Sequence, residues 1–434
     1  MPAAEEPAVR LPFSRVWMQI LAQTKARLDA PAGPTAWTDP PTTPAEDIRV
    51  WAPPAARGPT CGEVVLRLEN VSKIFGSVRA VDSATLEVRR GETFTLLGPS
   101  GCGKTTTLRL VAGLERPDAG EIVLRDRIVA SVPRRIWVPP HKRNLGMVFQ
   151  SYAIWPHMTV FENVAYPLRL RRLRSGEIKE RVARVLELVG LTGLEGRPAT
   201  LLSGGQMQRL ALCRALVYEP DLLLLDEPFS NLDAKLREQM RVELKLLQRR
   251  LGITVLFVTH DQIEALSLSE RVAVMYNGVV EQVGPPRSLY ERPASPFVRD
   301  FLGQTVILRG RTTATATDGA VTVKLDGLAP TDTLAGRLAA GTHLEPGAPA
   351  HLAVRPEDIR VEPADRPAAP AAGTVLTGTI DALLFIGDRY EARVSIGEGP
   401  HQRVLLYLPR GEAWREGQRL RLTFPPEVVS VWPA

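Results

Sequence analysis

The chain has 434 residues, of which 44% are hydrophobic and 24% are charged. These are ordinary values for globular proteins, so they exclude a wholly disordered chain or a fibre, and the length suggests two or three domains. The formal net charge of +6 is mild for this length and permits an acidic partner, such as a phosphate ligand or an anionic membrane face, without demanding one.

No segment of the sequence is expected to cross a membrane or to direct export. The longest apolar runs, such as residues 272–276, are far shorter than the ~18 residues that a membrane span needs. Glu5 and Glu6 stand where a signal peptide carries a basic stretch. The three cysteines are too few for a disulfide framework and lack the spacing of a metal site, which favours a reducing cytosol.

Residues 1–62 differ in composition from the rest of the chain. The sequence contains 37 prolines, against about 22 expected at ~5% usage. Eight of them lie between residues 31 and 59, which predicts an extended linker. Ahead of the linker, residues 13–28 carry an apolar stripe at helical spacing. Two interpretations stay open for this stripe: an interfacial or partner-binding helix, or a marginal helix on a disordered tail.

From residue 63 onward the pattern is that of a mostly parallel α/β sheet. A helix-rich stretch over 160–219 precedes the fourth of the expected strands, and another helix over 104–112 follows a glycine-rich turn. Alternating strands and helices are typical of such a sheet. The expected strands cover residues 64–71, 84–88, 93–97, 222–225 and 254–258.

Residues 98–105 match the phosphate-binding pattern GxxxxGK[ST], between a predicted strand and a predicted helix. Glycines let the backbone wrap around phosphate oxygens, and the helix N-terminus supplies positive potential. Lys104 is placed to neutralise the β- and γ-phosphates and the Thr105 hydroxyl to ligate Mg²⁺. Cys102 is interpreted as a tolerated small residue, not a nucleophile. The expected nucleotide contacts are Gly98, Pro99, Ser100, Gly101, Cys102, Gly103, Lys104, Thr105 and Thr106.

A loop of this kind needs an acidic partner strand, and residues 222–227 supply one. The apolar run 222–225 predicts a buried strand, and Asp226 at its carboxyl end can reach Mg²⁺. Glu227 follows directly and can orient or deprotonate an attacking water.

Residues 202–206 read Leu-Ser-Gly-Gly-Gln and precede a helical run over 207–217. They form a second anion-binding helix start, and a single domain rarely needs two such sites. Together with the phosphate loop, this string resembles the signature motif of the ATP-binding-cassette (ABC) ATPases. Further positions match marks of that family: Gln150 in its Q-loop, Asp233 in its D-loop, His260 as its switch histidine, and Phe75 where an aromatic stacks on adenine.

The resemblance covers residues 63–302 and implies a P-loop NTPase core with a helical subdomain over about 151–220. It implies a head-to-tail dimer in which ATP and Mg²⁺ lie between the phosphate loop of one copy and the signature of the other. The signature residues concerned are Ser203, Gly204, Gly205 and Gln206. Glu227, His260 and Gln150 would act at the γ-phosphate, with Thr105, Asp226 and Gln150 at the metal.

Residues 303–434 change to short alternating segments, for example 306–311, 320–325 and 375–380, which predict an all-β domain with a small barrel. A weak internal similarity joins residues 352–361 to 422–431; either a duplicated β unit or chance explains it. A cassette followed by such a domain, of the OB-like TOBE type, is similar to the importer ATPases.

The segment 149–160 is similar to iron(III)- and polyamine-type members of that subfamily, and the segment 261–265 is also typical of the subfamily. Sugar and glycerol phosphate are the less favoured solutes. The resemblance implies separate membrane permease subunits, an extracytoplasmic solute-binding protein reached through them, a homodimer and a peripheral location on the cytoplasmic face of the membrane, without nucleic acid. The extension over 1–62 departs from the usual importer pattern.

Several alternatives stay open. Tyr152, Trp155 and Met158 are either permease contacts or core residues of the helical subdomain. The basic run over 169–184 is either a solvated helix face or a surface near anionic headgroups. The competing functions are a soluble ABC ATPase and a nucleotide-sensing regulator, both without a permease.

Overall fold

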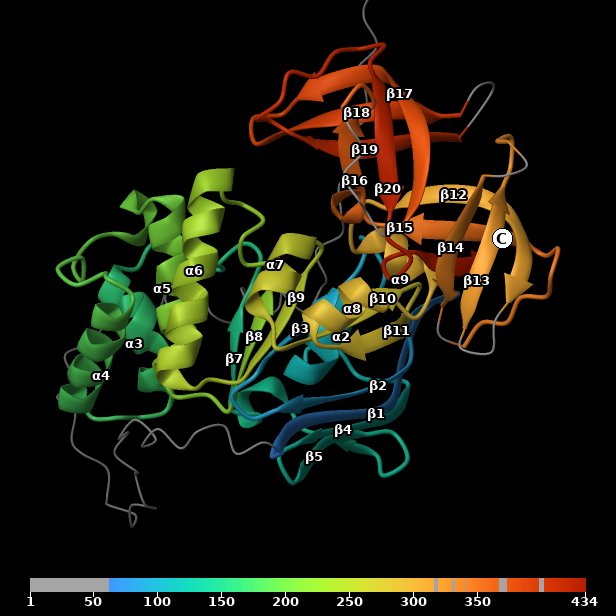
Figure 1. The fold of residues 1–434 in the computed structure, drawn as a ribbon. Coiled ribbons are helices and arrows are strands. Elements are labelled where there is room, and N and C mark those ends of the chain that lie inside the picture. The colour runs from blue at the N-terminus through green and yellow to red at the C-terminus, as the bar shows by residue number, and fades with distance from the viewer. Residues whose placement is uncertain (1–61, 316–318, 330–331, 340, 367–372, 398–401) are drawn as a thin grey trace, which may run out of the picture. The chain divides into compact units, whose positions relative to one another are not determined.

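The computed structural model describes residues 62–434, apart from 316–318, 330–331, 340, 367–372 and 398–401 (Figure 1). The predicted extension, with its apolar stripe over 13–28, lies outside the described residues except for Gly62. None of the helices in the described part is long and apolar enough to cross a membrane.

A six-stranded, mainly parallel sheet forms the centre of the α/β part, in the order β11-β10-β3-β9-β8-β7. Every residue of β3, β8 and β9 is buried. Strands covered on both faces read as continuous apolar runs, which is why the sequence signal here was clear. The strands are β3 (Thr93–Leu97), β7 (Leu145–Val148), β8 (Leu222–Asp226), β9 (Val255–Thr259), β10 (Arg271–Tyr276) and the antiparallel edge strand β11 (Val279–Gly284).

A second, antiparallel sheet has the order β2-β1-β4-β5-β6. Its first two strands are longer than the predicted 64–71 and 84–88, because bulges let the pair continue where the alternation of apolar and polar residues breaks down. The strands are β1 (Val64–Phe75), β2 (Val78–Arg89), β4 (Ala119–Leu124), β5 (Arg127–Ser131) and β6 (Ile136–Trp137).

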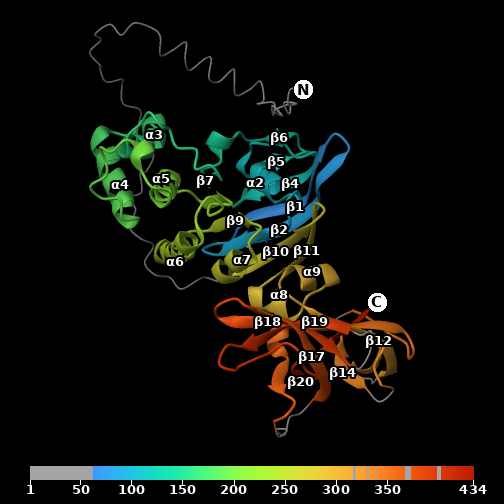
Figure 2. The same ribbon diagram turned by 90° about the horizontal axis from the view of Figure 1, so that it is seen from above.

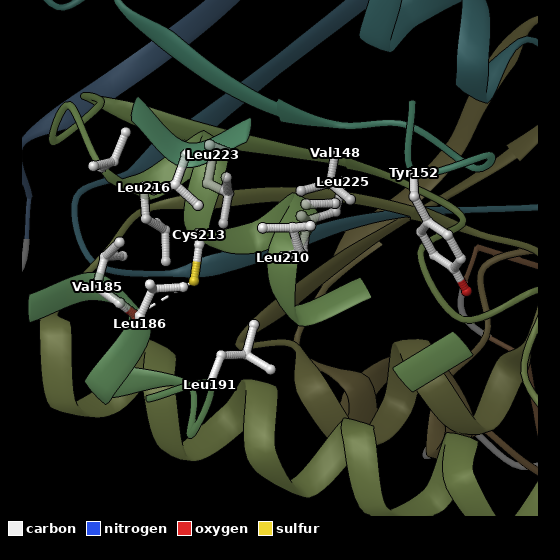
Figure 3. Close-up of a cluster of buried hydrophobic side chains, with 14 of the residues drawn as sticks. Val148, Tyr152, Val185, Leu186, Leu191, Leu210, Cys213, Leu216, Leu223 and Leu225 are labelled. Atoms are coloured by element: carbon white, nitrogen blue, oxygen red, sulfur yellow. Dashed lines mark hydrogen bonds between the residues drawn. The ribbon is translucent and has the colours of Figure 1, made fainter. Parts of the chain in front are cut away.

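The helices α3, α4 and α5 lie beside one another next to β7 in both ribbon views (Figures 1 and 2). They share an apolar cluster with β8, in which the Cys213 thiol donates a hydrogen bond to the Val185 carbonyl (Figure 3). The helices are α2 (Lys104–Ala112), α3 (Val160–Leu170), α4 (Ser175–Leu188), α5 (Gly204–Leu216), α6 (Ala234–Leu251), α7 (Gln262–Leu268), α8 (Pro286–Glu291) and α9 (Pro296–Phe301). Short 3₁₀ turns cover Pro140–Lys142, Ala199–Leu201 and Pro356–Asp358.

The all-β part contains the predicted small barrel and, in addition, a five-stranded sheet. The closed barrel has the order β12-β13-β14-β21-β15, and the sheet has the order β16-β20-β17-β18-β19. The barrel strands are β12 (Val306–Thr315), β13 (Ala320–Leu325), β14 (Thr333–Leu338), β15 (Pro349–Val354) and β21 (Ser430–Pro433). The sheet strands are β16 (Arg360–Pro363), β17 (Thr374–Phe385), β18 (Arg389–Ile396), β19 (Gln402–Pro409) and β20 (Arg419–Phe424).

Each of the two similar segments of the sequence starts in one of these β units, the barrel or the sheet, and ends in the other. Residues 352–361 run from β15 of the barrel into β16, which pairs with β20 of the sheet. Residues 422–431 run from β20 of the sheet into β21, which pairs with β15 of the barrel. This reciprocal arrangement favours a duplicated β unit over chance similarity.

A buried arginine connects the end of α2 to the antiparallel sheet. The Arg143 guanidinium donates hydrogen bonds to the carbonyls of Leu110, Val111, Val138 and Val129 at 2.7–3.2 Å. Burial lowers the pKa of Arg143 to about 10, so the group remains charged at neutral pH. The cation thus satisfies carbonyls at the C-terminus of the helix, where positive charge is favourable.

Replacing Arg143 with leucine is expected to lower the free energy of unfolding by about 3 kcal/mol, because four carbonyls lose their donor. Urea unfolding followed by circular dichroism measures the change. The matched control is Arg249→Leu, at an exposed position on α6, with an expected change within about 0.5 kcal/mol. Equal effects of the two substitutions would contradict the assigned role of Arg143.

Candidate nucleotide site

The glycine-rich loop before α2 is shaped by Gly103, which caps that helix. Its φ of +103° lies in the left-handed region, and a Cβ there would lie 2.2 Å from the carbonyl oxygen of Ala80. Only glycine combines this backbone conformation with so close an approach. The loop therefore packs directly on the backbone of β2, and the first turn of α2 directly follows the loop.

Lys104 lies inside this loop, with a side chain that is only 4% exposed. Its Nζ donates to the carbonyls of Gly98 and Pro99, both at 2.8 Å, and lies 3.7 Å from the Cys102 sulfur. Burial raises the pKa of the Cys102 thiol, which disfavours the nucleophilic thiolate. The loop thus concentrates positive charge where a phosphate would lie.

Thr105 and Asp226 are brought together at the carboxyl edge of the parallel sheet. The Thr105 hydroxyl donates to the Asp226 carboxylate at 3.0 Å. Burial raises the pKa of Asp226, and the hydrogen bond from Thr105 opposes this effect. Two hard oxygen donors beside a phosphate loop suit Mg²⁺, which binds through one or two protein oxygens, substrate phosphates and water. The donor set therefore fits the predicted metal.

Glu227 receives two side chains from separate segments of the chain. His260 Nδ1 lies 3.1 Å from Glu227 Oε1, and Gln150 Nε2 donates to Glu227 Oε2 at 3.3 Å. Glu227 has a φ of +44°, and its backbone N–H donates to the Val258 carbonyl. The Asn231 amide donates to the Gln150 carbonyl at 2.8 Å, which ties the D-loop to the Q-loop. The three side chains predicted to act at the γ-phosphate are therefore neighbours.

The signature segment forms the N-terminus of α5. The Ser203 hydroxyl accepts from the Gln206 N–H at 3.4 Å, while the Gln206 side chain accepts from the Ser203 N–H at 3.0 Å. This is a capping box, and it directs the hydrogen bonds of both residues into the first turn of their own helix. The signature is thus not joined by these bonds to the cluster around Glu227. Ser203 is exposed.

Two other predicted contacts lie at the ends of elements. The Asp233 carboxylate accepts from the Leu236 N–H at 3.0 Å and caps α6. Phe75 ends β1 and is 45% exposed, with the Lys73 Nζ 5.1 Å from the centre of its ring. Both geometries leave the nucleotide contacts of Asp233 and Phe75 as predictions.

Of the three residues considered for a permease contact, Tyr152 belongs to the apolar cluster of the helical subdomain and is 7% exposed. Trp155 and Met158 are partly exposed, and the Trp155 ring lies 4.5 Å from that of Tyr166. In the basic run, Arg171 bonds to Asn144, Arg181 pairs with Glu219 and Arg184 pairs with Glu180. The remaining cations of that run keep both interpretations open.

Sequence reasoning missed Thr259 and Glu264, which bond to each other on either side of His260 in the sequence. The Thr259 hydroxyl donates to the buried Glu264 carboxylate at 2.6 Å and accepts from the Asp261 N–H at 3.0 Å. Asp261 in turn caps α7. An acidic residue four positions after His260, on the apolar side of a short helix, was the signal available in the sequence.

Comparison with known proteins identifies the family. Residues 81–230 match the ABC transporter family, and residues 352–432 match the TOBE domain. The chain is 48% identical to the spermidine/putrescine import ATP-binding protein PotA of Rubrobacter xylanophilus, over 86% of this chain and 92% of that protein. It is 46% identical to the Fe(3+) ions import ATP-binding protein FbpC 1 of Rhizobium meliloti, over 78% and 89%. It is 56% identical to the trehalose/maltose import ATP-binding protein MalK of Thermococcus litoralis, over 55% and 64%.

The chain therefore belongs to the ATP-binding proteins of the ABC transporters. Within that family it is the ATPase subunit of an importer, with a C-terminal TOBE domain. The predictions of the family, the fold class and the ATP-hydrolysing activity are confirmed. The resemblance drawn from residues 63–302 thus extends to both parts of the described chain.

The buried Glu264 predicts a pH dependence of stability. Burial raises the pKa of Glu264, so the folded protein keeps a proton that the unfolded chain releases at lower pH. The free energy of unfolding then falls as pH rises through that window. Glu264→Gln has no proton to lose and should gain stability relative to the natural protein between about pH 4.5 and about pH 8. Urea unfolding of both proteins at both pH values tests this prediction. If the free energies of unfolding of Glu264→Gln and the natural protein differ equally at the two pH values, the prediction is wrong.

Proposed function

We propose that this chain hydrolyses ATP to drive the uptake of a polyamine or of iron(III) through separate permease subunits. The support for the solute class is the similarity to proteins named for spermidine/putrescine and Fe(3+) import. The observation that carries the motor function is the convergence of Gln150 and His260 on Glu227, beside the Thr105–Asp226 pair. Sugar import, supported by the similarity to a trehalose/maltose protein, is the less favoured alternative.

In the proposed reaction, Lys104 and the loop amides bind the β- and γ-phosphates. Thr105, Asp226 and Gln150 would hold Mg²⁺, which would supply positive charge at the phosphate oxygens. Glu227 accepts a proton from the attacking water. His260, at 3.1 Å from Glu227, holds that carboxylate in position and reaches the γ-phosphate. Phe75 stacks on the adenine.

Two copies are proposed to bind ATP head to tail. The N-terminus of α5 starts at the exposed Ser203, followed by the partly exposed Gly204 and the buried Gly205, and the Ser203 hydroxyl and the glycine N–H groups of this helix start suit an anion. Because the bonds of Ser203 and Gln206 stay within α5, the signature can meet a phosphate held by another copy. The separation of the two subunits then depends on the nucleotide, which gives a transporter its two states.

The permease is proposed to dock near the loop after Gln150. Trp155 and Met158 are partly exposed there and have the adaptable apolar surfaces that interfaces favour. Tyr152, being buried, supports the loop from beneath. An extracytoplasmic binding protein would act through the permease, with the chain peripheral on the cytoplasmic face of the membrane.

Substitution of Glu227 by glutamine is expected to lower ATP turnover by about 100-fold or more, because the water loses its proton acceptor. ATP binding should survive, and ATP should trap a dimer, measurable by size-exclusion chromatography with light scattering. Glu238→Gln, at an exposed position of α6, is the matched control and should turn over normally. Normal turnover in Glu227→Gln would refute the role assigned to Glu227.

Affinity purification of the full chain from native membranes in mild detergent tests the transport function. A multi-span permease and a solute-binding protein are expected to co-purify, and uptake assays with spermidine and with iron(III) then identify the solute. Recovery of ribosomes or repair factors alone would favour a soluble ABC ATPase. Recovery of the chain alone would favour a nucleotide-sensing regulator.

A further inference from the structure

Arg214, near the C-terminal end of α5, forms hydrogen bonds with the loop that follows Gln150. Its guanidinium donates to the Ala153 carbonyl at 2.5 Å and to the Tyr152 carbonyl at 2.8 Å. The same group lies 4.8 Å from the centre of the Trp155 ring. Arg214 is half-buried, and this burial lowers its pKa, so two carbonyls and an aromatic face hold a partly buried cation. A planar, two-pronged donor of this kind fixes the loop and the helix in one relative geometry.

The loop that Arg214 holds is strained. Tyr152 and Ala153 are consecutive non-glycine residues in the left-handed region, with φ of +60° and +48°. In Figure 3 Tyr152 closes one end of the apolar cluster, and its buried hydroxyl has no hydrogen-bond partner in the described part of the chain. Such conformations persist only where surrounding contacts enforce them, and they concentrate in segments that switch. Arg214 supplies that enforcing contact.

The loop and the helix that Arg214 connects lead to two different parts of the candidate nucleotide site. On the loop side, Gln150 bonds to Glu227 at 3.3 Å and to Asn231 at 2.8 Å, within the catalytic cluster. On the helix side, Ser203 caps α5 eleven residues before Arg214, roughly 16 Å along a rigid helix. In a head-to-tail dimer, Gln150 serves the ATP bound by its own chain and Ser203 serves the ATP bound by the other copy.

We propose that Arg214 is a positioning residue that couples the two ATP sites of the dimer. The inference rests on the head-to-tail dimer of the proposed function. A displacement of the loop after Gln150 in one site is transmitted by Arg214 to α5, and so to the signature that faces the other site. Without Arg214 the two sites would act independently, with the chemistry of each site intact.

The test is the dependence of ATP hydrolysis on ATP concentration, measured on the purified full chain. The natural protein should give a Hill coefficient above about 1.5 and Arg214→Met one of about 1. Turnover of Arg214→Met at saturating ATP should stay within about threefold of the natural value. The matched control is Arg209→Met on the same helix, because Arg209 bonds to Val189 and Glu243 instead of the loop. It should keep the natural Hill coefficient.

A natural Hill coefficient in Arg214→Met would overturn the proposal, as would an equal loss in Arg209→Met. If Arg214→Met fails to fold, Arg214→Lys replaces it, since lysine keeps the positive charge but lacks the planar, two-pronged donor that bonds to both carbonyls. A lowered Hill coefficient in Arg214→Lys would support the coupling, and an unchanged one would refute it. Dimer trapping by Glu227→Gln distinguishes a failure of the coupling from a failure of the dimer. If Glu227→Gln traps a dimer and Arg214→Met still hydrolyses ATP cooperatively, only the coupling is refuted. If Glu227→Gln traps no dimer, both the dimer and the coupling are refuted.

Discussion

The carboxyl ends of β3, β8 and β9 meet at one edge of a buried parallel sheet, and the whole nucleotide site depends on this constraint. The strand register sets Leu97 against Thr259 and Asp226 against Val258. Both faces of these strands are covered, so apart from the buried Thr93 and Thr95 of β3, their polar residues, Asp226 and Thr259, stand at the carboxyl ends. The phosphate loop, the acidic pair and the switch histidine, far apart in the sequence, therefore become neighbours.

The elements around the phosphate loop could be predicted with their bounds, as β3 and α2 show. Their limits follow from a continuous apolar run, a glycine turn and a helix start, all of which are local in the sequence. The ends of β1 and β2 could not be predicted, because bulges maintain pairing after the residue alternation is lost. The second sheet of the all-β part was missed for a related reason. The pattern of short alternating strands shows neither how many sheets they form nor which strands pair with one another.

The same division holds for the site. The residues proposed to contact phosphate, metal or water have fixed spacings, so the burial of Lys104 in its loop and the pairing of Thr105 with Asp226 could be predicted from patterns. The supporting residues were not, because Arg143 and Arg214 bond to backbone carbonyls that any sequence supplies. Their partners are defined by the fold alone. The capping role of Gln206 lies between these cases, since serine followed three residues later by glutamine is a known helix start.

The exchange of β16 and β21 makes the two halves of the all-β part inseparable. The barrel is closed by β21, which pairs with both β14 and β15 although the whole five-stranded sheet lies between β15 and β21 in the sequence. During synthesis the barrel strands β12 to β15 therefore emerge long before the strand that closes them. The edges of β14 and β15 stay open until residues 430–433 have left the ribosome. The order of translation thus places the closure of this barrel after the synthesis of every strand of the five-stranded sheet.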